Sequence, residues 1–480
     1  MHIAFYFAHG FAARMILRAG VVQQLVSSDA HVTIITANAD ETYFQQECRE
    51  AGAELVQEPK SSGRISNWFR SYRPYLLDDV MNNPALKSGH LTRFQGRPLR
   101  GFLMEAVNRT AAKSLNIRKA TRSIEHRLNR SQDIHELLCR LRPDLLIVFT
   151  PFGQTDTLYL LHAKELGIPV VCEMLSWDNI TSKGTPLMMP DYFISWGPIM
   201  TEEMINWYGF PRARIFECGV PHFDVYRNTE QLTPSTTLLQ KLNLSTDRPY
   251  ILYGMVARIF CPNELEIVRW LAKRINSNSF SKPCSLIIRP HPQMVSGYYA
   301  SGKDLNDLKS VTGPNVAVDV PPVLSEALAW DLPKHDMYHL ASLLAGCAVC
   351  INASSTLCLD ACMLDRPVIN VGFDGLQELP YEESARRGLD FIHMRKLLSL
   401  GGVRLARSFT ELQDHINAYL NDPGLDHKGR SLTVEQECRS ADGRAAERVA
   451  GTLLELARRA CPEMPSSSSK REIRLQERAS

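Results

Sequence analysis

Short apolar runs alternate with amphipathic segments through the first half of the chain. Ile3 to Phe7, His31 to Ala37 and Leu145 to Phe149 are predicted to be buried strands, because continuous apolar runs are typical of strands covered on both faces. Helical spacing of apolar positions predicts helices over Ala12 to Val26 and Asp156 to Glu165. The alternation continues through Pro169 to Cys172, Tyr192 to Ser195 and Thr201 to Tyr208. This order predicts a parallel sheet with helices on both faces.

The second half repeats the pattern after a polar stretch with little apolar periodicity, Asn228 to Asp247. Its predicted strands are Tyr250 to Gly254, Ser285 to Ile288, Val316 to Asp319, Ala348 to Ile351 and Val368 to Val371. We therefore expect an α/β protein with two facing doubly wound, Rossmann-like domains. The expected divisions are residues 1–227 for an N-terminal domain, 228–247 for the linker, 248–440 for a C-terminal domain, 441–461 for a terminal helix and 462–480 for a disordered tail.

Length and charge support this division and narrow the class of protein. A chain of 480 residues exceeds what one hydrophobic core usually serves. Its 54 Lys and Arg against 52 Asp and Glu leave a formal charge of +2, which argues against a general nucleic-acid binder. The sequence has no apolar run long enough to cross a membrane and no signal-peptide pattern, so we expect a cytoplasmic protein.

Cysteine spacing gives one possible metal motif. The 12 cysteines are too sparse for a disulfide scaffold, but Cys347 and Cys350 have the spacing of a zinc-binding pair, with Cys358 and Cys362 nearby. The first pair falls in the apolar run Cys347 to Ile351, and the alternation of a strand over this run directs the two side chains to opposite faces. We therefore expect no metal site and thiols that behave as small hydrophobes.

Polar and cationic residues follow two predicted strands of the second half. Arg289 and His291 come directly after one strand, in the sequence Arg-Pro-His-Pro. Ser354, Ser355 and Thr356 come after another and are expected to open a helix. Sheets of this kind bind ligands at the carboxyl ends of their strands, and the hydroxyls and amides of a helix N-terminus can hold a phosphate. The two segments together predict a clamp for a nucleotide diphosphate.

Several motifs give the chain a resemblance to a known superfamily. Two facing doubly wound domains with the His-Pro, the Ser-Ser-Thr and the segment Asp442 to Arg448 resemble the GT-B glycosyltransferases. Leu175 to Gly184, Pro190 to Tyr192 and Gly219 to Asp224 resemble a branch of bacterial surface-carbohydrate biosynthesis proteins. The His-Pro and Ser-Ser pair is also similar to that of CDP-glycerol glycerophosphotransferases and of CMP-sugar transferases. The resemblance implies a sugar-nucleotide donor and metal-independent transfer.

Metal-independent transfer needs groups that neutralise the charge developing on the leaving nucleotide. Besides the Arg-Pro-His-Pro pair and the serines, Arg258 is a candidate for this task, and Asp360 for a hydrogen bond with a donor hydroxyl. The loop with Asp374 and Glu378 is expected to form the pocket for ribose and base. The alternatives are structural: a surface ion pair for Arg289, a loop histidine, a plain helix cap for the serines, and an ordinary turn for the last loop.

The reaction also needs a base on the first domain that takes a proton from an acceptor hydroxyl. His9 ends the first predicted strand and precedes Gly10, which lets backbone approach a ligand closely. A base at that position occurs in some inverting members of the superfamily. Asp178, in a Trp-Asp-Asn loop, is the rival candidate, and Glu173 is near it in the sequence. The alternatives are an Asx turn at Asp178, a hydrogen bond from His9 to the neighbouring strand, and a base located elsewhere.

The segment 60–142 is strongly basic, with 17 Lys and Arg against 6 Asp and Glu. Aromatic residues are interspersed with its arginines, among them Arg93, Arg97 and Arg100. This combination suits an anionic bilayer surface or a polyprenyl-phosphate acceptor. The alternative is a solvated insertion whose aromatic residues pack on the domain. RNA binding is disfavoured because the sequence has no known single-strand-binding motif.

We therefore expect a glycosyltransferase that moves a sugar, or a sugar-like polyol phosphate, from a nucleotide donor to a surface polysaccharide or lipid-linked acceptor. Capsule and lipopolysaccharide are the settings that this implies, at the inner face of a membrane. The nucleotide-sugar is a substrate, and no cofactor is expected. Three alternatives stay open: an enzyme like UDP-N-acetylglucosamine 2-epimerase, a CDP-glycerol-type glycerophosphotransferase, and a non-catalytic GT-B-like scaffold.

Overall fold

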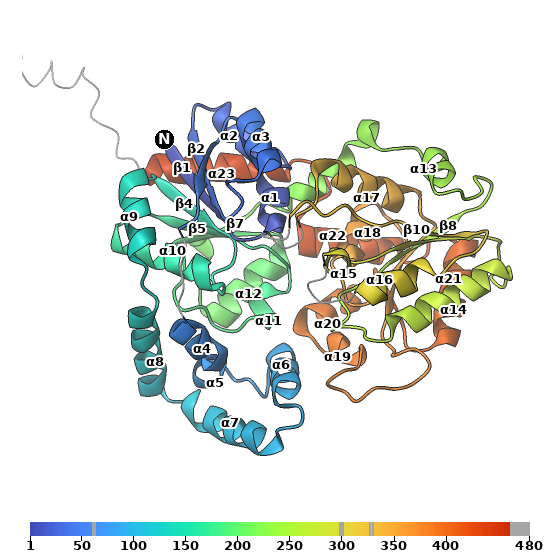
Figure 1. The fold of residues 1–480 in the computed structure, drawn as a ribbon, viewed down its shortest axis with the longest axis horizontal. Helices are drawn as coiled ribbons and strands as arrows, with labels where there is room; N and C mark the ends of the chain where they lie inside the picture. The colour runs from blue at the N-terminus through green and yellow to red at the C-terminus, as the bar shows by residue number, and fades with distance from the viewer. Residues whose placement is uncertain (60–63, 297–301, 326–327, 329–330, 461–480) are drawn as a thin grey trace, which may run out of the picture.

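Two parallel β-sheets lie side by side along the long axis of the molecule (Figure 1). The computed structural model describes residues 1–59, 64–296, 302–325, 328 and 331–460. Neighbouring named strands in both sheets are parallel, from the pairing of β1 with β2 to that of β12 with β13. The expected α/β fold with two Rossmann-like domains is confirmed.

The first sheet has seven strands in the order β3-β2-β1-β4-β5-β6-β7. They are β1 (His2–Phe7), β2 (His31–Thr36), β3 (Glu54–Gln57), β4 (Leu145–Val148), β5 (Val170–Glu173), β6 (Tyr192–Ser195) and β7 (Ile215–Glu217). The inner strands are almost wholly buried, as expected where helices cover both faces. The edge strands β3 and β7 are short and partly exposed, so the hydrophobic pattern did not predict them.

The second sheet has six strands in the order β10-β9-β8-β11-β12-β13. They are β8 (Tyr250–Gly254), β9 (Ser285–Arg289), β10 (Val316–Val318), β11 (Val349–Asn352), β12 (Val368–Val371) and β13 (Arg404–Ala406). In each sheet the first strand lies between the second and the fourth. The strand order therefore reverses between β1 and β4 and again between β8 and β11, and ligands bind outside such reversal points.

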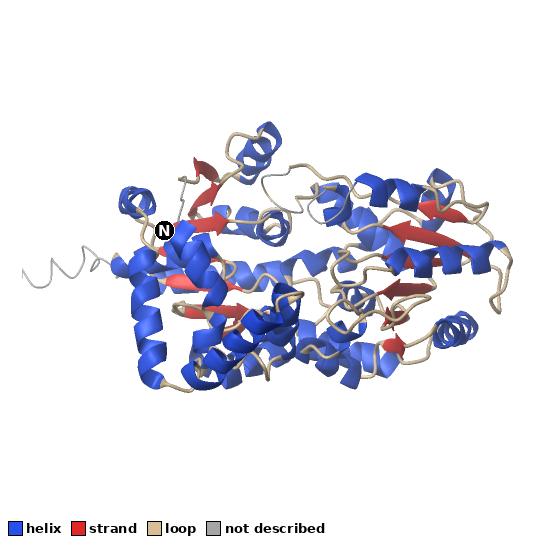
Figure 2. Cartoon of the chain, turned by 60° about the horizontal axis from the view of Figure 1, so that its bottom comes forward, coloured by secondary structure: helices blue, strands red, loops and turns tan. Residues whose placement is uncertain are grey.

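Helices cover both faces of each sheet (Figure 2). The first sheet is accompanied by α1 (Gly10–Ile16), α2 (Val21–Val26), α3 (Thr42–Ala51), α9 (Gln132–Leu141), α10 (Gln154–Glu165), α11 (Asn179–Ser182), α12 (Pro198–Tyr208), and the 3-10 helices η1 (Arg212–Arg214) and η2 (Pro221–Arg227). The second is accompanied by α14 (Glu264–Asn276), α15 (Pro292–Val295), α16 (Gly302–Lys309), α17 (Lys334–Gly346), α18 (Leu357–Met363), α19 (Arg386–Leu389), α20 (Ile392–Ser399), α21 (Phe409–Asn421) and α22 (His427–Cys438). No helix in the described part of the chain is long and apolar enough to span a membrane.

The segment expected as one helix from Ala12 to Val26 forms two helices, α1 and α2. Gly20 lies between them with a φ of 89°, in the left-handed region. Glycine adopts this conformation without the steric cost that a side chain would impose. The chain therefore changes direction at Gly20. The spacing of apolar residues continues across this position, which is why a single helix was expected.

A helical insertion between β3 and β4 projects from the first domain (Figure 1). Its helices are α4 (Arg64–Tyr72), α5 (Pro74–Leu77), α6 (Pro84–Phe94), α7 (Pro98–Ala111) and α8 (Leu115–Leu128). The insertion also contacts the second domain, where Arg387 Nη1 donates to Thr92 Oγ1 at 3.3 Å and Gln95 Nε2 donates to Glu383 Oε1 at 2.5 Å. These helices form most of the basic segment 60–142.

The chain crosses between the domains twice. The range expected as a linker, residues 228–247, contains η3 (Thr229–Gln231) and α13 (Ser235–Lys241), and α13 packs on α17 through buried leucines. The terminal helix α23 (Ala445–Ala460) returns to the first domain and packs against α2 and β4. The expected tail, residues 462–480, lies outside the described residues. The domain divisions themselves stay a prediction.

One loop of the second domain is anchored in the first. Asp331, just before α17, is 0% exposed. Its carboxylate accepts from Arg18 Nη1 at 2.5 Å and from the Tyr43 hydroxyl at 2.5 Å. Gly10 permits the close approach, since a Cβ at that position would lie 2.6 Å from the Asp331 Cα. The two domains are therefore in contact at the first turn of α1.

Candidate functional site

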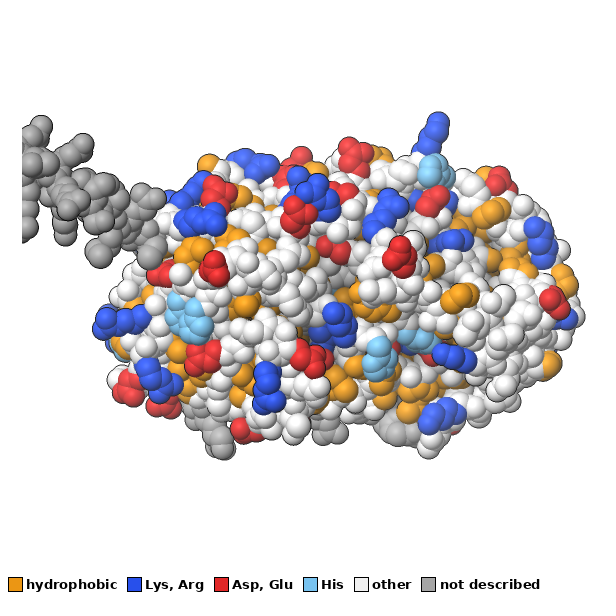
Figure 3. Space-filling view, turned by 90° about the horizontal axis from the view of Figure 1, so that it is seen from above, with side chains coloured by type: hydrophobic (Ala, Val, Ile, Leu, Met, Phe, Trp, Pro, Cys, Tyr) orange, Lys and Arg blue, Asp and Glu red, His pale blue; other side chains and the backbone are white. Residues whose placement is uncertain are grey.

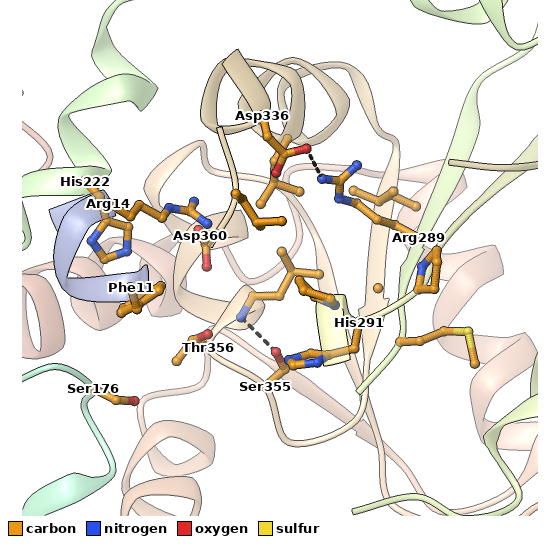
Figure 4. A pocket seen from close by; sticks show the side chains of 18 of the residues that line it. Phe11, Arg14, Ser176, His222, Arg289, His291, Asp336, Ser355, Thr356 and Asp360 are labelled. Atoms are coloured by element: carbon orange, nitrogen blue, oxygen red, sulfur yellow. Dashed lines mark hydrogen bonds and ion pairs between the residues drawn. The ribbon is translucent and has the colours of Figure 1, made fainter. Parts of the chain in front are cut away.

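A cavity of about 250 Å³ lies between the domains, beyond the carboxyl ends of both sheets (Figure 4). The polar side chains that line it come from both domains. The first domain contributes Arg14, Ser176 and His222, and the second contributes Arg289, His291, Asp336, Ser355, Thr356 and Asp360. The sequence-predicted residues Arg289, His291, Ser355, Thr356 and Asp360 are thus brought together in one cavity.

The second-domain wall is built on three neighbouring strands, β9, β8 and β11. The backbone at Gly254, where β8 ends, lies so close to α18 that a Cβ would be 2.2 Å from Leu357 Cδ2. Helix α18 begins at Leu357, after the residues that were expected to open it. Ser355 Oγ accepts from the Leu357 amide at 3.2 Å, and Ser354 has a left-handed φ of 48°. The serines therefore form a turn that precedes the helix.

Arg289 is buried between two carboxylates. Its guanidinium pairs with Asp319, and its Nη2 lies 2.5 Å from Asp336 Oδ1. Burial alone would lower its pKa, but the carboxylates of Asp336 and Asp319 outweigh burial and raise it. Arg289 is therefore a permanent cation whose charge is already balanced within the second domain. This differs from the structural alternative considered for Arg289, a surface ion pair, because the pair is buried.

His291 lines the same second-domain wall of the cavity as Ser355 (Figure 4). It is the N-cap of α15, and its Nδ1 accepts from the Gln293 amide at 3.2 Å. Burial lowers its pKa to about 4, so the ring is neutral near pH 7. With Nδ1 used as an acceptor, the proton is on Nε2, which can donate to a ligand oxygen.

The first-domain wall consists of Phe11, Arg14 and His222. Phe11 and Arg14 are three residues apart on α1 and share a face, with the Arg14 guanidinium carbon 5.7 Å from the Phe11 ring centre. Arg14 Nε is buried and has no hydrogen-bond partner among the described residues. His222, on η2, stacks edge-on against Phe11 at 4.9 Å between ring centres. The wall thus has a cation, Arg14, that forms fewer hydrogen bonds within the described protein than Arg289 does.

His222 is a buried imidazole that lines the cavity. Burial, and then the nearby Arg14 charge, lower its pKa well below the usual value. Its Nδ1 has no hydrogen-bond partner in the described part of the chain. A neutral imidazole that lines the cavity can accept a proton from a group bound there.

Asp360 lies at the boundary between the walls. The Tyr226 hydroxyl donates to its Oδ1, and the Arg14 side chain points toward it (Figure 4). Burial raises the pKa of Asp360, while Arg14 and the Tyr226 hydrogen bond oppose that rise. This carboxyl therefore joins the two domains and also faces the cavity.

The two base candidates from the sequence do not line the cavity. His9 is the N-cap of α1, where its Nδ1 accepts from the Phe11 amide at 3.1 Å, and burial lowers its pKa to about 4. Asp178 accepts from Ser176 Oγ at 2.6 Å and from Ser182 Oγ at 2.8 Å. Burial alone would raise the Asp178 pKa, but the charges of Lys183 and His393 and these hydrogen bonds lower it. Asp178 reaches the cavity only through Ser176.

Four predicted donor-binding residues are also absent from the residues that line this cavity. Asp374 instead holds its own loop, accepting from Ser384 Oγ at 2.7 Å and from the Ala385 amide at 2.7 Å. Glu378 is exposed and pairs with Arg386 at 3.4 Å. The other two are Ser354, whose amide donates to Asn370 Oδ1 at 2.7 Å, and the exposed Arg258. Arg93, Arg97 and Arg100 lie on the insertion, on or beside α6 and α7.

One group of described residues has ligand atoms close enough for a metal: His135, His162 and Glu165, on α9 and α10. His162 Nε2 accepts from the Ser131 amide at 3.0 Å, which leaves the ring proton on Nδ1. That Nδ1 lies 3.0 Å from Glu165 Oε2 and donates to it. The His162 nitrogen that faces the group therefore has no free lone pair. His135 Nδ1 lies 4.0 Å from Glu165 Oε2, beyond hydrogen-bond distance.

Sequence reasoning missed Arg14, His222 and Asp336. Arg14 and Asp336 lie within helices, where no local pattern marks them as ligand-binding. His222 lies in the segment Gly219 to Asp224, whose resemblance was noted without any chemistry being assigned to it. That motif was the available signal, and its imidazole lies five residues after the end of β7, a strand that the hydrophobic pattern did not predict.

Two Rossmann-like domains that face each other across a ligand cavity define the GT-B class of transferases. Residues 163–455 match the family model of CDP-Glycerol:Poly(glycerophosphate) glycerophosphotransferase. This match covers more than half of the chain, and the chain belongs to that family. Membership supports a transferase, as expected.

Solved structures with the same architecture share little sequence with the chain. A UDP-bound MnaA structure from S. aureus has 10% identity and a TM-score of 0.55, and covers 97% of this chain and 99% of its own. UDP-GlcNAc 2-epimerase from Neisseria meningitidis, bound to UDP-GlcNAc, has 13% identity, a TM-score of 0.54 and coverage of 95% and 100%. A glycosyltransferase from Rickettsia africae has 10% identity, a TM-score of 0.50 and coverage of 96% and 98%. These likenesses establish the fold. No curated protein matches the chain.

Proposed function

We propose that the protein transfers a polyol phosphate from a nucleotide-activated donor, of the kind that CDP-glycerol represents, to a hydroxyl group of a surface-glycan or lipid-linked acceptor. The observation that carries the proposal is the cavity where Arg14 and His222 of one domain face His291, Ser355 and Thr356 of the other. The family to which the chain belongs supports the same donor class.

The donor phosphates are proposed to lie between His291, the Ser355 and Thr356 hydroxyls, and Arg14. The His291 Nε2–H and the two hydroxyls donate to phosphate oxygens, and the Arg14 guanidinium supplies the positive charge. Arg289 has both carboxylate partners inside the protein, so its role is to hold the wall that bears His291. These groups neutralise the leaving nucleotide without a metal in the proposal.

The acceptor hydroxyl is proposed to approach from the first domain, with His222 as the base. The hydroxyl oxygen forms a bond to the phosphorus distal to the nucleoside, and the anhydride bond of that phosphorus breaks. The nucleoside monophosphate leaves, and the hydroxyl proton passes to the neutral His222 ring. The donor phosphates lie close to this ring and stabilise its protonated form. His9 and Asp178 stay the alternative bases.

Sugar transfer is the second candidate, because two of the similar folds are described as complexes with UDP or UDP-GlcNAc. In that reaction the acceptor hydroxyl attacks the anomeric carbon, and a nucleoside diphosphate leaves. The same cavity groups would stabilise the leaving phosphates. An epimerase of similar fold would need no acceptor, and a scaffold would bind nucleotide weakly or not at all.

The proposal is tested by incubating the purified protein with CDP-glycerol, UDP-GlcNAc and CMP-sugars, with and without a glycan acceptor, in EDTA. Acceptor-dependent release of CMP from CDP-glycerol is the expected result. Release of a nucleoside diphosphate from a sugar donor would select the second candidate. Turnover of a nucleotide sugar alone would indicate an epimerase.

The site assignment is tested separately by His291→Ala, which removes a proposed phosphate donor. We expect donor binding to weaken by about 1–3 kcal/mol in free energy, the scale of a charge-assisted hydrogen bond. His427→Ala, an exposed second-domain histidine that pairs with Asp365 outside the cavity lining, is the matched control. Unchanged affinity in a folded His291→Ala variant would contradict the site.

A further inference from the structure

The helix α7 of the insertion turns its apolar side toward solvent. Leu99 is 80% exposed, Phe102 66% and Leu103 62%. At 3.6 residues per turn these positions, with Val107, fall on one face of the helix. Scattered exposed leucines are ordinary in soluble proteins, but a continuous apolar face marks a surface that is covered in use.

The packing of α7 fixes this orientation. Its inner side is made of small and polar residues: Asn108 Nδ2 donates to the Tyr75 carbonyl at 3.0 Å and to the Asp78 carbonyl at 2.7 Å. Gly101 sits against α6, where a Cβ would lie 3.2 Å from Phe94 Cβ. The hydrogen bonds of Asn108 tie the helix to α5 by its polar side. The apolar side is therefore left outward by the structure of the insertion itself.

Basic side chains flank the apolar face of α7. On the helical wheel, Arg100 and Arg109 fall about 90° to either side of the centre of that face. Arg97 and Lys113 are exposed at the two ends of the helix. An amphipathic helix that lies in a membrane interface has this arrangement, with apolar side chains in the acyl region and long cations reaching the headgroups.

Helix α8, like α7, exposes apolar side chains and buries polar ones. Ile117, Ile124 and Leu128 are 39%, 48% and 37% exposed, and their spacing places them along one stripe. The helix buries polar residues instead, and Glu125 pairs with Arg73 at 3.0 Å. Two consecutive helices thus direct polar groups inward and apolar groups outward.

We propose that α7 and α8 form a docking surface for an anionic lipid bilayer. Charge complementarity selects this occupant: segment 60–142 has 17 Lys and Arg against 6 Asp and Glu, so a second copy of the same surface would be repelled. The face opposite the insertion has basic and acidic side chains interspersed (Figure 3). The surface lies outside the cavity and does not depend on the identity of the donor.

Vesicle sedimentation tests the proposal with the full chain. Wild-type protein should bind vesicles of phosphatidylglycerol and phosphatidylcholine and bind phosphatidylcholine vesicles poorly. Binding should weaken steeply as salt shortens the Debye length from about 10 Å at 0.1 M to about 3 Å at 1 M. The variant Leu99→Ser/Phe102→Ser/Leu103→Ser should lose about tenfold or more in partition. Arg93→Glu/Arg97→Glu/Arg100→Glu should lose about 100-fold.

Matched controls reverse or truncate exposed residues of the second domain. Lys309→Glu/Arg407→Glu/Lys428→Glu changes the same net charge, and Leu376→Ser removes a side chain that is 75% exposed. Both should bind vesicles within about twofold of wild type, and the unfolding temperature of each variant reports its folding. Three outcomes overturn the proposal: no binding to anionic vesicles at low salt, equal binding to neutral vesicles, or a dimer in solution that the serine variant separates.

Discussion

The two walls of the cavity hold their charges in different ways. On the second-domain wall, Arg289 is locked between Asp319 and Asp336, and its charge is balanced before any ligand arrives. On the first-domain wall, Arg14 Nε and His222 Nδ1 have no hydrogen-bond partners among the described residues. Unpaired buried polar atoms are costly, and a ligand that pairs them regains that energy. The polar groups of the first wall can therefore form new interactions with a ligand, whereas those of the second wall are already paired and form a rigid frame.

The largest expected effect is on turnover when the base is removed from the first wall. His222→Ala should lower kcat by about 10²–10⁴ with little change in donor affinity, because a base acts in the transition state. Steady-state kinetics and a donor titration separate the two quantities. His9→Ala and Asp178→Asn, measured alongside, decide between the candidates, since a larger loss in either would transfer the role from His222.

The second expected effect is on stability, at the rigid wall. Arg289→Met leaves Asp336 buried without its counter-ion and leaves Asp319 with His339 alone, so the free energy of unfolding should fall by about 3–5 kcal/mol. Urea unfolding measures it. Adding Asp336→Asn to this variant should recover part of the loss. A stable Arg289→Met protein with weakened donor binding would show instead that Arg289 contacts the donor.

The third effect is on donor affinity at the first wall. Arg14→Met keeps the apolar stem and removes the charge, and should weaken donor binding by about 1–3 kcal/mol with a small change in unfolding temperature. Isothermal titration with the donor measures this. Arg49→Met, at an exposed position of α3, is the control. Equal affinities for the two variants would remove Arg14 from the site.

The pH dependence of stability tests the burial of Glu173, which ends strand β5 of the first domain. Burial raises the pKa of Glu173 to about 8, and neither carboxylate oxygen has a hydrogen-bond partner among the described residues. The folded state therefore keeps a proton that the unfolded state has lost, and stability should decrease between pH 4.5 and 8, by at most about 1.4 kcal/mol per pH unit. Glu173→Gln removes the contribution of this residue to the slope, while Glu264 and Glu437, whose pKa values burial also raises to about 8, keep theirs. The exposed Glu50→Gln leaves the slope unchanged. Urea unfolding at several pH values distinguishes them.

The smallest effect is expected at the turn of the rigid wall. Ser355→Ala removes a hydroxyl that faces the cavity and should weaken donor binding by about 0.5–1.5 kcal/mol. Ser354→Gly, whose left-handed backbone suits glycine, should leave affinity unchanged. If the glycine variant weakens binding as much as the alanine variant, the turn acts through its shape rather than through its hydroxyl.

The inner strands of both sheets could be predicted because each is a continuous apolar run, as in Tyr250 to Gly254. The edge strands β3, β7 and β13 and the helices of the insertion could not, whereas the edge strand β10 lies within the predicted range Val316 to Asp319. Strands β3 and β7 are too short and too exposed to show a pattern, and α7 and α8 invert the rule that apolar faces are buried. A method that places apolar residues inside cannot locate a helix that holds them outside.

The candidate site could be predicted where polar side chains come just after a strand, at His291 and Ser355. It could not be predicted at Arg14, because a residue within a helix reaches the cavity only through the packing of α1 against the second domain. The same limit applies to Arg289, whose position after a strand was evident but whose carboxylate partners come from later segments of the chain. Motifs show which groups are present, and tertiary contacts decide which of them are available.

The position of helix α23 in the chain constrains when the first domain can complete its core during synthesis. It is made near the end of the chain, yet its buried face, including Val449 and Leu453, completes the core of the first domain against α2 and β4. The first domain therefore emerges from the ribosome with an uncovered apolar groove, which stays open while the entire second domain is translated. Until α23 has been made, the N-terminal half must fold around the space that this helix fills.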